Sequence, residues 1–158
     1  MHVSISIGPE PLDATAEWTA FQQALDGATG AVAAFCGLVR DRFDDRPVGS
    51  LTLEHYPGMT EKSIERIVGT ASKRWALQHV RVVHRVGTVG ASEPIVLVLV
   101  ASGHRDAAFA ACELIMDLLK TEAVFWKKED SPSGARWIES TEHDRKRARA
   151  WRENRPQD

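Results

Sequence analysis

Every residue in the segment 95–101 is apolar, and this run constrains the fold more than any other part of the chain. A strand with one face in water would alternate apolar and polar residues. An uninterrupted apolar run therefore predicts a strand that is covered on both faces. The residues 102–105 lead from it into a run with helical spacing that ends at Lys120. We expect a sheet with helices packed against it.

The remaining segments alternate between strand-like and helix-like patterns. Strands are predicted at residues 3–7, 30–39 (as a central strand), 50–56 and 80–86, and a hairpin at 123–130 and 136–139. Helices are predicted at 13–25 with Trp18, Phe21 and Leu25 on one stripe, at 60–75 with Thr60 as its cap, and at 104–120 with Phe109 on its buried stripe.

These elements predict one α+β domain over residues 1–158, with a mixed or antiparallel sheet. Residues 41–49 are polar and contain proline, so we expect a loop there, and residues 87–94 are expected to connect two strands. Residues 141–158 are charged and helix-prone, and we expect them to end as a frayed tail.

The composition excludes several classes of function. The formal net charge of the 158 residues is −2, which gives no overall field to attract nucleic acid or an anionic membrane. The sequence has no apolar run long enough to cross a bilayer and no signal-peptide pattern at its start. Two distant cysteines form neither a disulfide framework nor a zinc motif, and the histidines have no metal-binding spacing. We expect a cytoplasmic protein that binds no metal.

His104 and Arg105 stand between the apolar run and the next helix. The first N–H groups of a helix are unpaired and its dipole is positive there, so this pair could bind a phosphate group. An alternative is equally compatible with the pattern: Arg105 pairs with a surface carboxylate and His104 caps the helix.

Lys120 and Lys127 are the candidates for chemistry. Lys120 at the end of a helix would by itself be explained by the helix dipole. If residues 124–129 form a strand, Phe125, Lys127 and Glu129 share one face. A lysine packed against aromatic surface and near other cations has a depressed pKa, which makes its neutral amine accessible. The spacing does not show whether the two lysines meet.

The length of the helix separates these two groups. From Arg105 to Lys120 the rise is about 22 Å, too far for one small ligand to touch both ends. We therefore hypothesise that two copies of the chain bring opposite helix ends together in a composite pocket. Arg40, which follows an apolar segment, is a further anion contact, unless it pairs with Asp41 or Asp44.

Taken together, the segments resemble the large, catalytic subunit of molybdopterin synthase, most closely over residues 28–140. The resemblance rests on the order and spacing of many pieces: Gly30-Ala31-Val32, Phe35-x-Gly37-x-Val39-Arg40, the run 51–62, His84-Arg85-Val86-Gly87, Ser102-x-His104-Arg105, Ala108-Phe109, Ile115-Met116-Asp117, Leu119-Lys120, Phe125-Trp126-Lys127-Lys128-Glu129 and Trp137. Val124 stands where relatives usually have proline, which implies a less rigid approach to Phe125, and Thr141 stands where some have arginine.

The resemblance implies an α/β hammerhead-type fold and a homodimer that carries a small ubiquitin-like sulfur carrier at each end, making a heterotetramer. The carrier's C-terminal Gly-Gly tail, as a thiocarboxylate, would supply two sulfurs to cyclic pyranopterin monophosphate, so that the chain itself binds no cofactor. Lys120 and Lys127 match the catalytic lysines of the family. The substrate-binding positions would be Arg40, His104 and Arg105 at the pterin phosphate, with Leu38, Val39, Lys128 and Glu129 lining the pocket.

Two other functions are open alternatives. The chain could be a non-catalytic module that docks a ubiquitin-like partner, although a scaffold has no need of both lysines. It could also be a sulfurtransferase that carries a persulfide on Cys36. Against this, Cys36 and Cys112 both fall in apolar patterns, so we expect both to be buried in the core and inert.

Overall fold

The computed structural model describes residues 1–43 and 45–153. Its larger sheet has the strand order β1 (His2–Gly8), β6 (Leu77–Arg85), β8 (Pro94–Ser102) and β2 (Ala31–Leu38). β1 and β6 are parallel and the other pairs are antiparallel. This mixed sheet confirms the predicted class. β2, however, lies at the edge, so its prediction as a central strand was wrong.

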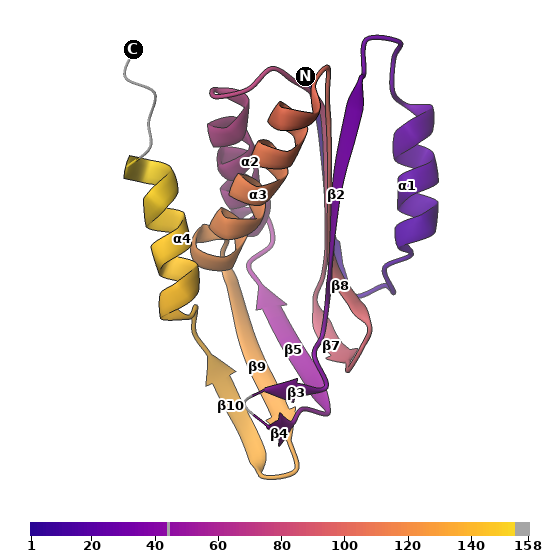
Figure 1. The fold of residues 1–158 in the computed structure, drawn as a ribbon. Helices are drawn as coiled ribbons and strands as arrows, with labels where there is room; N and C mark the ends of the chain where they lie inside the picture. Colours follow the sequence, from indigo (N-terminus) through magenta and orange to yellow (C-terminus); the bar gives the residue numbers. More distant parts are fainter. Residues whose placement is uncertain (44, 154–158) are drawn as a thin grey trace.

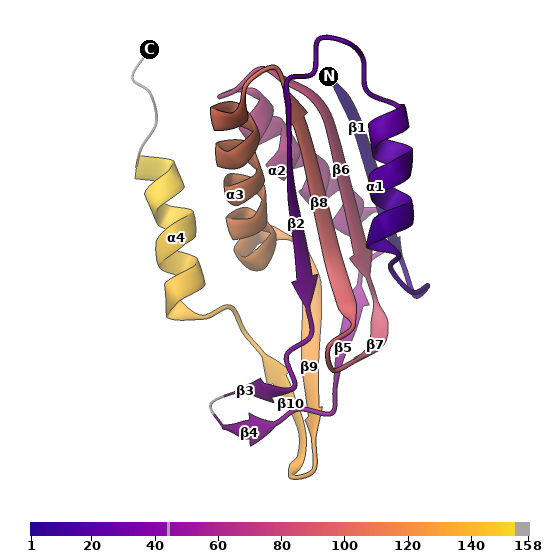
Figure 2. The same cartoon turned by 45° about the vertical axis from the view of Figure 1, so that its right-hand side comes forward.

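Helices cover both faces of this sheet (Figures 1 and 2). α1 (Ala14–Gln23) lies on one face, and α2 (Met59–Ser72) and α3 (Arg105–Glu122) lie on the other. β8 passes between them and is buried from Ile95 to Ser102, as its apolar run predicts. On α1, Asp13 accepts hydrogen bonds from the N–H groups of Thr15 and Ala16, and Phe21 is buried, but the predicted stripe was wrong at Trp18, which is exposed.

A second sheet extends below α3 in Figure 1. Its strands are β10 (Gly134–Ile138), β9 (Phe125–Ser131), β5 (Ser50–His55) and β7 (Gly87–Gly90), in that order. The hairpin of β9 and β10 was predicted, whereas β7 falls within the expected connection. Gly87 has φ +77°, a conformation that glycine adopts without strain, and it lets the chain pass from β6 into β7.

The segment 41–49 was predicted as a loop. It contains two short antiparallel strands, β3 (Arg42–Phe43) and β4 (Arg46–Pro47). Asp44 lies outside the described residues, as do residues 154–158 at the end of the predicted tail. The tail itself forms α4 (Glu142–Glu153), which packs beside α3.

α2 begins one residue earlier than predicted and is not capped by Thr60. Gly58 occupies the cap position with φ +84°, and its N–H donates to the Glu61 carboxylate at 2.6 Å. Thr60 is buried in the first turn, where its hydroxyl donates to the carbonyl of Val124 at 2.8 Å. The N–H of Val124 in turn donates to the Ser63 hydroxyl at 3.2 Å. The start of α2 thus holds the segment that leads into β9.

Candidate active site

A pocket of about 520 Å³ lies where the last turn of α3 meets β9, the segment after β2 and the start of α4. Lys120 contributes from α3, and Phe125, Lys127 and Glu129 contribute from β9. The alternation of a strand places these β9 side chains on one face. The sequence pattern predicted that Phe125, Lys127 and Glu129 share a face. It did not show whether Lys120 and Lys127 come together, and the structure places both in this pocket.

The two lysines influence each other electrostatically. Burial lowers the pKa of Lys127 below its usual 10.5, the positive charge of Lys120 lowers it further, and the carboxylate of Asp144 acts in the opposite direction. Each effect follows from ordinary electrostatics, since low-dielectric surroundings and like charge both disfavour an ammonium ion. Lys127 can therefore exchange a proton more readily than an exposed lysine.

Phe125, which lines the pocket, packs against a buried histidine. The ring of His84 stacks on Phe125, with ring centroids 4.2 Å apart. Burial lowers the pKa of His84 to about 4; its contact with the Arg85 carbonyl favours the charged form, and the nearby Lys127 charge disfavours it. His84 Nδ1 lies 2.8 Å from the Arg85 carbonyl oxygen, which fixes Nδ1 as the protonated nitrogen of a neutral ring. The wall of the site at Phe125 is thus aromatic, and the His84 ring behind it is uncharged near neutral pH.

The structure brings together six of the nine residues that the sequence nominated: Leu38, Val39, Arg40, Lys120, Lys127 and Glu129 all line the pocket. Lys128 does not line it, because its place in β9 directs it to the opposite face from Lys127. Glu129 is bound by Arg136 across the hairpin, with Nη2 and Oε2 3.2 Å apart.

His104 and Arg105 lie elsewhere, at the start of α3. Both are exposed, and Arg105 Nε is 3.7 Å from Asp106 Oδ1. His104 occupies the N-cap position, but its side chain makes no capping hydrogen bond within the described residues. The 18 residues of α3 span about 27 Å, so the pair does not reach the lysine pocket of its own chain.

Several pocket residues were missed from the sequence, including Arg42, Arg136 and Asp144. Thr141, which the resemblance marked only as a replacement for an arginine of some relatives, lines the pocket as well. One local signal was present. Thr141 and Asp144 have the three-residue spacing of a helix cap, which would have located the start of α4. Nothing local would have placed that start beside Lys120, because this depends on how α4 packs on α3.

A larger pocket, of about 720 Å³, lies between α1 and the strands β1 and β6. Its cationic groups are already engaged: Arg81 pairs with Glu17 at 2.8 Å, and Arg85 pairs with Glu93 at 2.8 Å. The larger pocket also contains His79 and His84, whose pKa values are lowered mainly by burial, but it contains no lysine. The smaller pocket joins two lysines, one of them with a lowered pKa, to three arginines, so it is the better candidate for chemistry on an anion.

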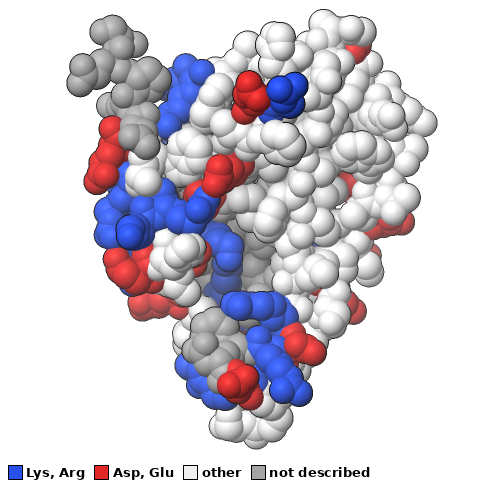
Figure 3. All heavy atoms as spheres, viewed as in Figure 1, with Lys and Arg blue, Asp and Glu red and all other residues white. Residues whose placement is uncertain are grey.

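Lysine and arginine side chains gather over α4 and the hairpin of β3 and β4, in the lower left of Figure 3. The surface over β2 in the same view is almost free of charge. The overall charge is slightly negative, so this local concentration of cations can attract an anionic ligand that the whole molecule would not.

The two cysteines differ. Cys112 is buried in α3, and burial raises the pKa of its thiol to about 11. Cys36 is exposed on β2, so the prediction that it lies in the core was wrong. Residues 34–36 of this edge strand are all exposed, so both of its faces are open at Cys36, which the apolar neighbours in the sequence did not reveal. Within residues 1–43 and 45–153, no group of His, Cys, Asp and Glu side chains could hold a metal ion, and no helix is long and apolar enough to cross a membrane.

Comparison with known proteins decides the family. A family model described as MoaE protein matches residues 7–122. The molybdopterin synthase catalytic subunit of Vibrio cholerae is 50% identical over 148 residues, covering 93% of this chain and 97% of that one. The chain belongs to the MoaE family of molybdopterin synthase catalytic subunits. It is thus a sulfur-transferring enzyme subunit of molybdopterin biosynthesis.

Solved structures of MoaE proteins agree with the fold. A molybdopterin biosynthesis MoaE protein from Burkholderia ambifaria has a TM-score of 0.78 and 44% identity, covering 95% of this chain and 98% of that one. A protein–protein complex of subunits 1 and 2 of molybdopterin-converting factor from Helicobacter pylori includes a chain with a TM-score of 0.68. That chain is 22% identical, with 89% of this chain and 90% of that one covered, so the likeness concerns the MoaE fold alone.

Proposed function

We propose that the pocket containing Lys120 and Lys127 is the place where this subunit transfers sulfur to cyclic pyranopterin monophosphate. The sulfur arrives as the thiocarboxylate at the C-terminal Gly-Gly tail of a small ubiquitin-like carrier. Two such transfers install the two dithiolene sulfurs of molybdopterin. The chain needs no cofactor of its own, because the sulfur is already activated on the carrier.

The observation that carries this proposal is the convergence of two lysines from separate elements in one pocket, one of them half-buried. The thiocarboxylate and the cyclic phosphate are both anionic, and ammonium groups in a partly dry pocket attract them more strongly than in water. Lys127, with its lowered pKa, is suited to move a proton when the cyclic phosphate opens. Lys120 is suited to hold negative charge as it develops.

A glycine tail suits a half-buried lysine. Because glycine has no side chain, a Gly-Gly tail can reach a lysine that a tail with bulky side chains could not reach. The chemistry of the partner's tail follows from this. The cytoplasm, where thiols such as Cys36 stay reduced, is the compartment that we propose.

His104 and Arg105 enter the proposal through a second copy of the chain. They lie one helix length from Lys120, yet they offer a bidentate guanidinium and an imidazole at a helix start, where phosphate binds well. We propose that a homodimer places this pair from one protomer near the lysine pocket of its partner. Two copies with a carrier at each end make a heterotetramer.

The decisive experiment mixes purified subunit, thiocarboxylated carrier and cyclic pyranopterin monophosphate, and measures dithiolene product. Lys120→Ala should abolish product while the circular dichroism spectrum is kept. Lys73→Ala, which removes an exposed lysine at the end of α2, is the matched control and should leave the rate unchanged. A Lys120→Ala variant with the full rate would overturn the assignment.

The composite pocket has its own test. Lys120→Ala and Arg105→Ala chains, each poorly active alone, are mixed and allowed to exchange protomers. A mixed dimer would contain one intact pocket, so part of the activity should return. Mixed dimers verified by mass spectrometry that recover no activity would contradict a pocket built from two chains.

A further inference from the structure

The pocket holds more positive than negative charge. Its cationic side chains are Lys120, Lys127, Arg40, Arg42 and Arg136. The carboxylates that line it belong to Glu129, Glu139 and Asp144. Such a set of cations needs a counter-charge before any anionic ligand arrives, since like charges at close range destabilise one another.

Of these carboxylates, Asp144 is the one placed to act on both lysines. Glu129 already pairs with Arg136 at 3.2 Å, and Glu139 is exposed. The charge of Asp144 acts on Lys127, and both lysines act in return on Asp144. Burial opposes the charged carboxylate, but the Thr141 hydrogen bond and Lys120 outweigh it, so the pKa of Asp144 lies below its usual value. Asp144 is therefore negative wherever the enzyme works near neutral pH.

The side chain of Asp144 is also held in one place. Its Oδ2 accepts hydrogen bonds from the Thr141 N–H at 3.2 Å and from the Thr141 hydroxyl at 2.8 Å. In return, the N–H of Asp144 donates to the Thr141 hydroxyl oxygen at 3.1 Å. This is a reciprocal helix cap, which stabilises the first turn of α4. Because both Thr141 bonds use Oδ2, Oδ1 is left outside the cap.

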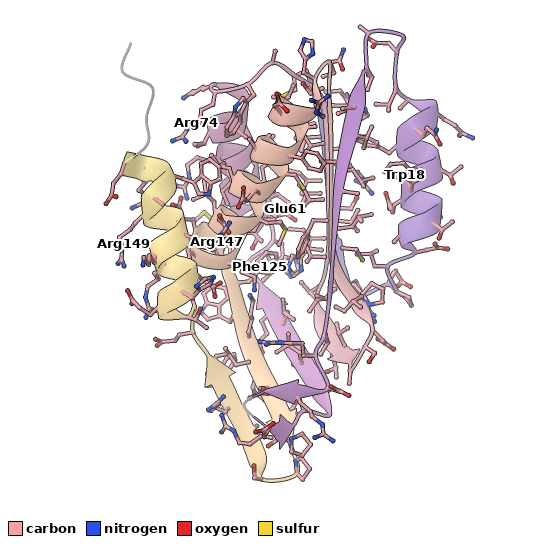
Figure 4. The ribbon with its side chains drawn as sticks, viewed as in Figure 1. Trp18, Glu61, Arg74, Phe125, Arg147 and Arg149 are labelled. Atoms are coloured by element: carbon pink, nitrogen blue, oxygen red, sulfur yellow. The ribbon has the colours of Figure 1, made fainter. Side chains whose placement is uncertain are left out.

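The position of the cap is fixed by the way α4 docks on α3. The Asp117 carboxylate, which is buried on α3, accepts from Arg147 Nε at 2.9 Å and from Trp151 Nε1 at 2.7 Å. Figure 4 shows Arg147 on the side of α4 toward α3 and Arg149 on its outer side. α4 is thus anchored along its length, and its first turn is brought to the lysine at the end of α3.

We propose that Asp144 is a positioning residue for the reaction: it is the fixed counter-charge that holds the ammonium groups of Lys120 and Lys127 together in the pocket. The inference rests on the proposed function of the lysine pair. Without the carboxylate, the two cations repel each other and Lys127 loses its proton more readily. His84, the remaining titratable group at Lys127, is neutral above its pKa of about 4 and cannot replace this charge.

The test compares Asp144→Asn with Glu142→Gln. Asparagine keeps an oxygen that can accept from Thr141, so the cap can persist while the charge is lost. Glu142 also lies in the first turn of α4, but it pairs with Arg145 and Arg149 and does not line the pocket, which makes it the matched loss of charge. The first readout is the pKa of the Lys127 amine. It is measured by an NMR pH titration of protein whose lysines are reductively ¹³C-methylated, and the signal of Lys127 is assigned by its absence from Lys127→Arg.

Removal of a nearby negative charge should lower the pKa of Lys127 by about one unit in Asp144→Asn and leave it unchanged in Glu142→Gln. The limb of the pH–rate profile that reports Lys127 should move to lower pH by the same amount, and Asp144→Glu should restore part of the shift. Helicity by circular dichroism should be equal in all variants.

A Lys127 pKa that is the same in Asp144→Asn and in the unsubstituted protein would overturn the inference, whatever the rates. An equal shift in Glu142→Gln would also overturn it, since any charge on α4 would then suffice. These outcomes are independent of the proposed function, because the pKa is measured without substrate. If Asp144→Asn fails to fold, Thr141→Val provides the second variant. This substitution removes the hydroxyl group that holds the Asp144 carboxylate in place. An unchanged Lys127 pKa in Thr141→Val would count against a fixed counter-charge.

Discussion

The two ends of α3 carry similar residues in different surroundings. At the first end, His104 and Arg105 are exposed, and Arg105 has a neighbouring aspartate 3.7 Å away. At the last end, Lys120 meets Lys127 in a pocket whose wall at Phe125 packs against His84. The difference comes from what packs against each end. Lys120 is itself exposed, but a second sheet and α4 bound the pocket that it shares with the half-buried Lys127, whereas within the described residues of one chain nothing comparable surrounds the basic pair.

The chemistry that a cationic side chain can perform depends on the elements that surround it. Both ends follow the usual helix preferences, with Asp106 in the first turn and Lys120 in the last. Only the enclosed end shows a shifted lysine pKa nearby. The predictions below test whether this difference governs the activity.

The largest effect is expected from Lys127→Ala. Loss of a half-buried amine that we propose moves a proton should lower kcat by at least about 100-fold, in the range of general acid–base catalysis. Single-turnover product formation would measure it, with Lys73→Ala as the exposed control. A fall of less than fivefold would show that enclosure of this lysine does not matter.

His84 should make stability depend on pH. Its folded pKa is about 4 and its unfolded pKa is 6.5, so between these values the unfolded chain binds more protons. The free energy of unfolding should therefore fall as pH drops from 6.5 to 4, by up to about 3 kcal/mol from this residue. Urea titrations across this range should show a flatter dependence for His84→Phe, which keeps a ring against Phe125. An equal slope in both proteins would contradict a buried neutral histidine.

Arg105→Ala should have a smaller effect, mainly on binding. An exposed arginine that contacts a phosphate across a dimer contributes one charge-assisted contact, so KM for the pterin should rise about tenfold with kcat less affected. The effect should weaken in high salt, because exposed charges are screened. Steady-state rates at two ionic strengths would measure both. A change confined to kcat would place Arg105 nearer the reacting atoms than we expect.

The smallest effect is expected at Cys36. Alkylation of native protein with iodoacetamide should modify this exposed thiol before Cys112, whose pKa is about 11. Activity should change by less than about twofold, as for a surface substitution. Loss of activity on alkylation, prevented by Cys36→Ser, would revive a persulfide route.

Much of the fold could be predicted because hydrophobic periodicity reports which face of an element is buried. It predicted β8 as doubly covered, and it predicted the face of β9 that carries Lys127. It cannot report how far a neighbour extends. Phe109 continues the apolar stripe of α3 and yet is 66% exposed, so its predicted burial was wrong, and β2 has the composition of a central strand although it lies at the edge.

The site was predicted in part for the same reason. Residues from β9 and the end of α3 were found because their chemistry is visible locally. Asp144 and Arg136 were missed because their relevance depends on contacts between distant segments: α4 against α3, and β10 against Glu129. The docking of α4 through Asp117 has no signature in local sequence.

Val124 shows how this chain solves a local problem in its own way. Where relatives usually have proline, the valine keeps an N–H group, and the start of α2 uses it: Ser63 accepts from the N–H, and Thr60 donates to the carbonyl. A pyrrolidine ring would restrict the backbone here, and in this chain the hydroxyl groups of Thr60 and Ser63 restrict it through hydrogen bonds. Val124→Pro would remove the hydrogen bond from this N–H to Ser63, which destabilises the fold, and would lower the conformational entropy of the unfolded chain, which stabilises it. The net change in the free energy of unfolding should therefore be small. The start of α2 thus fixes the route by which the chain enters β9, the strand that carries Lys127.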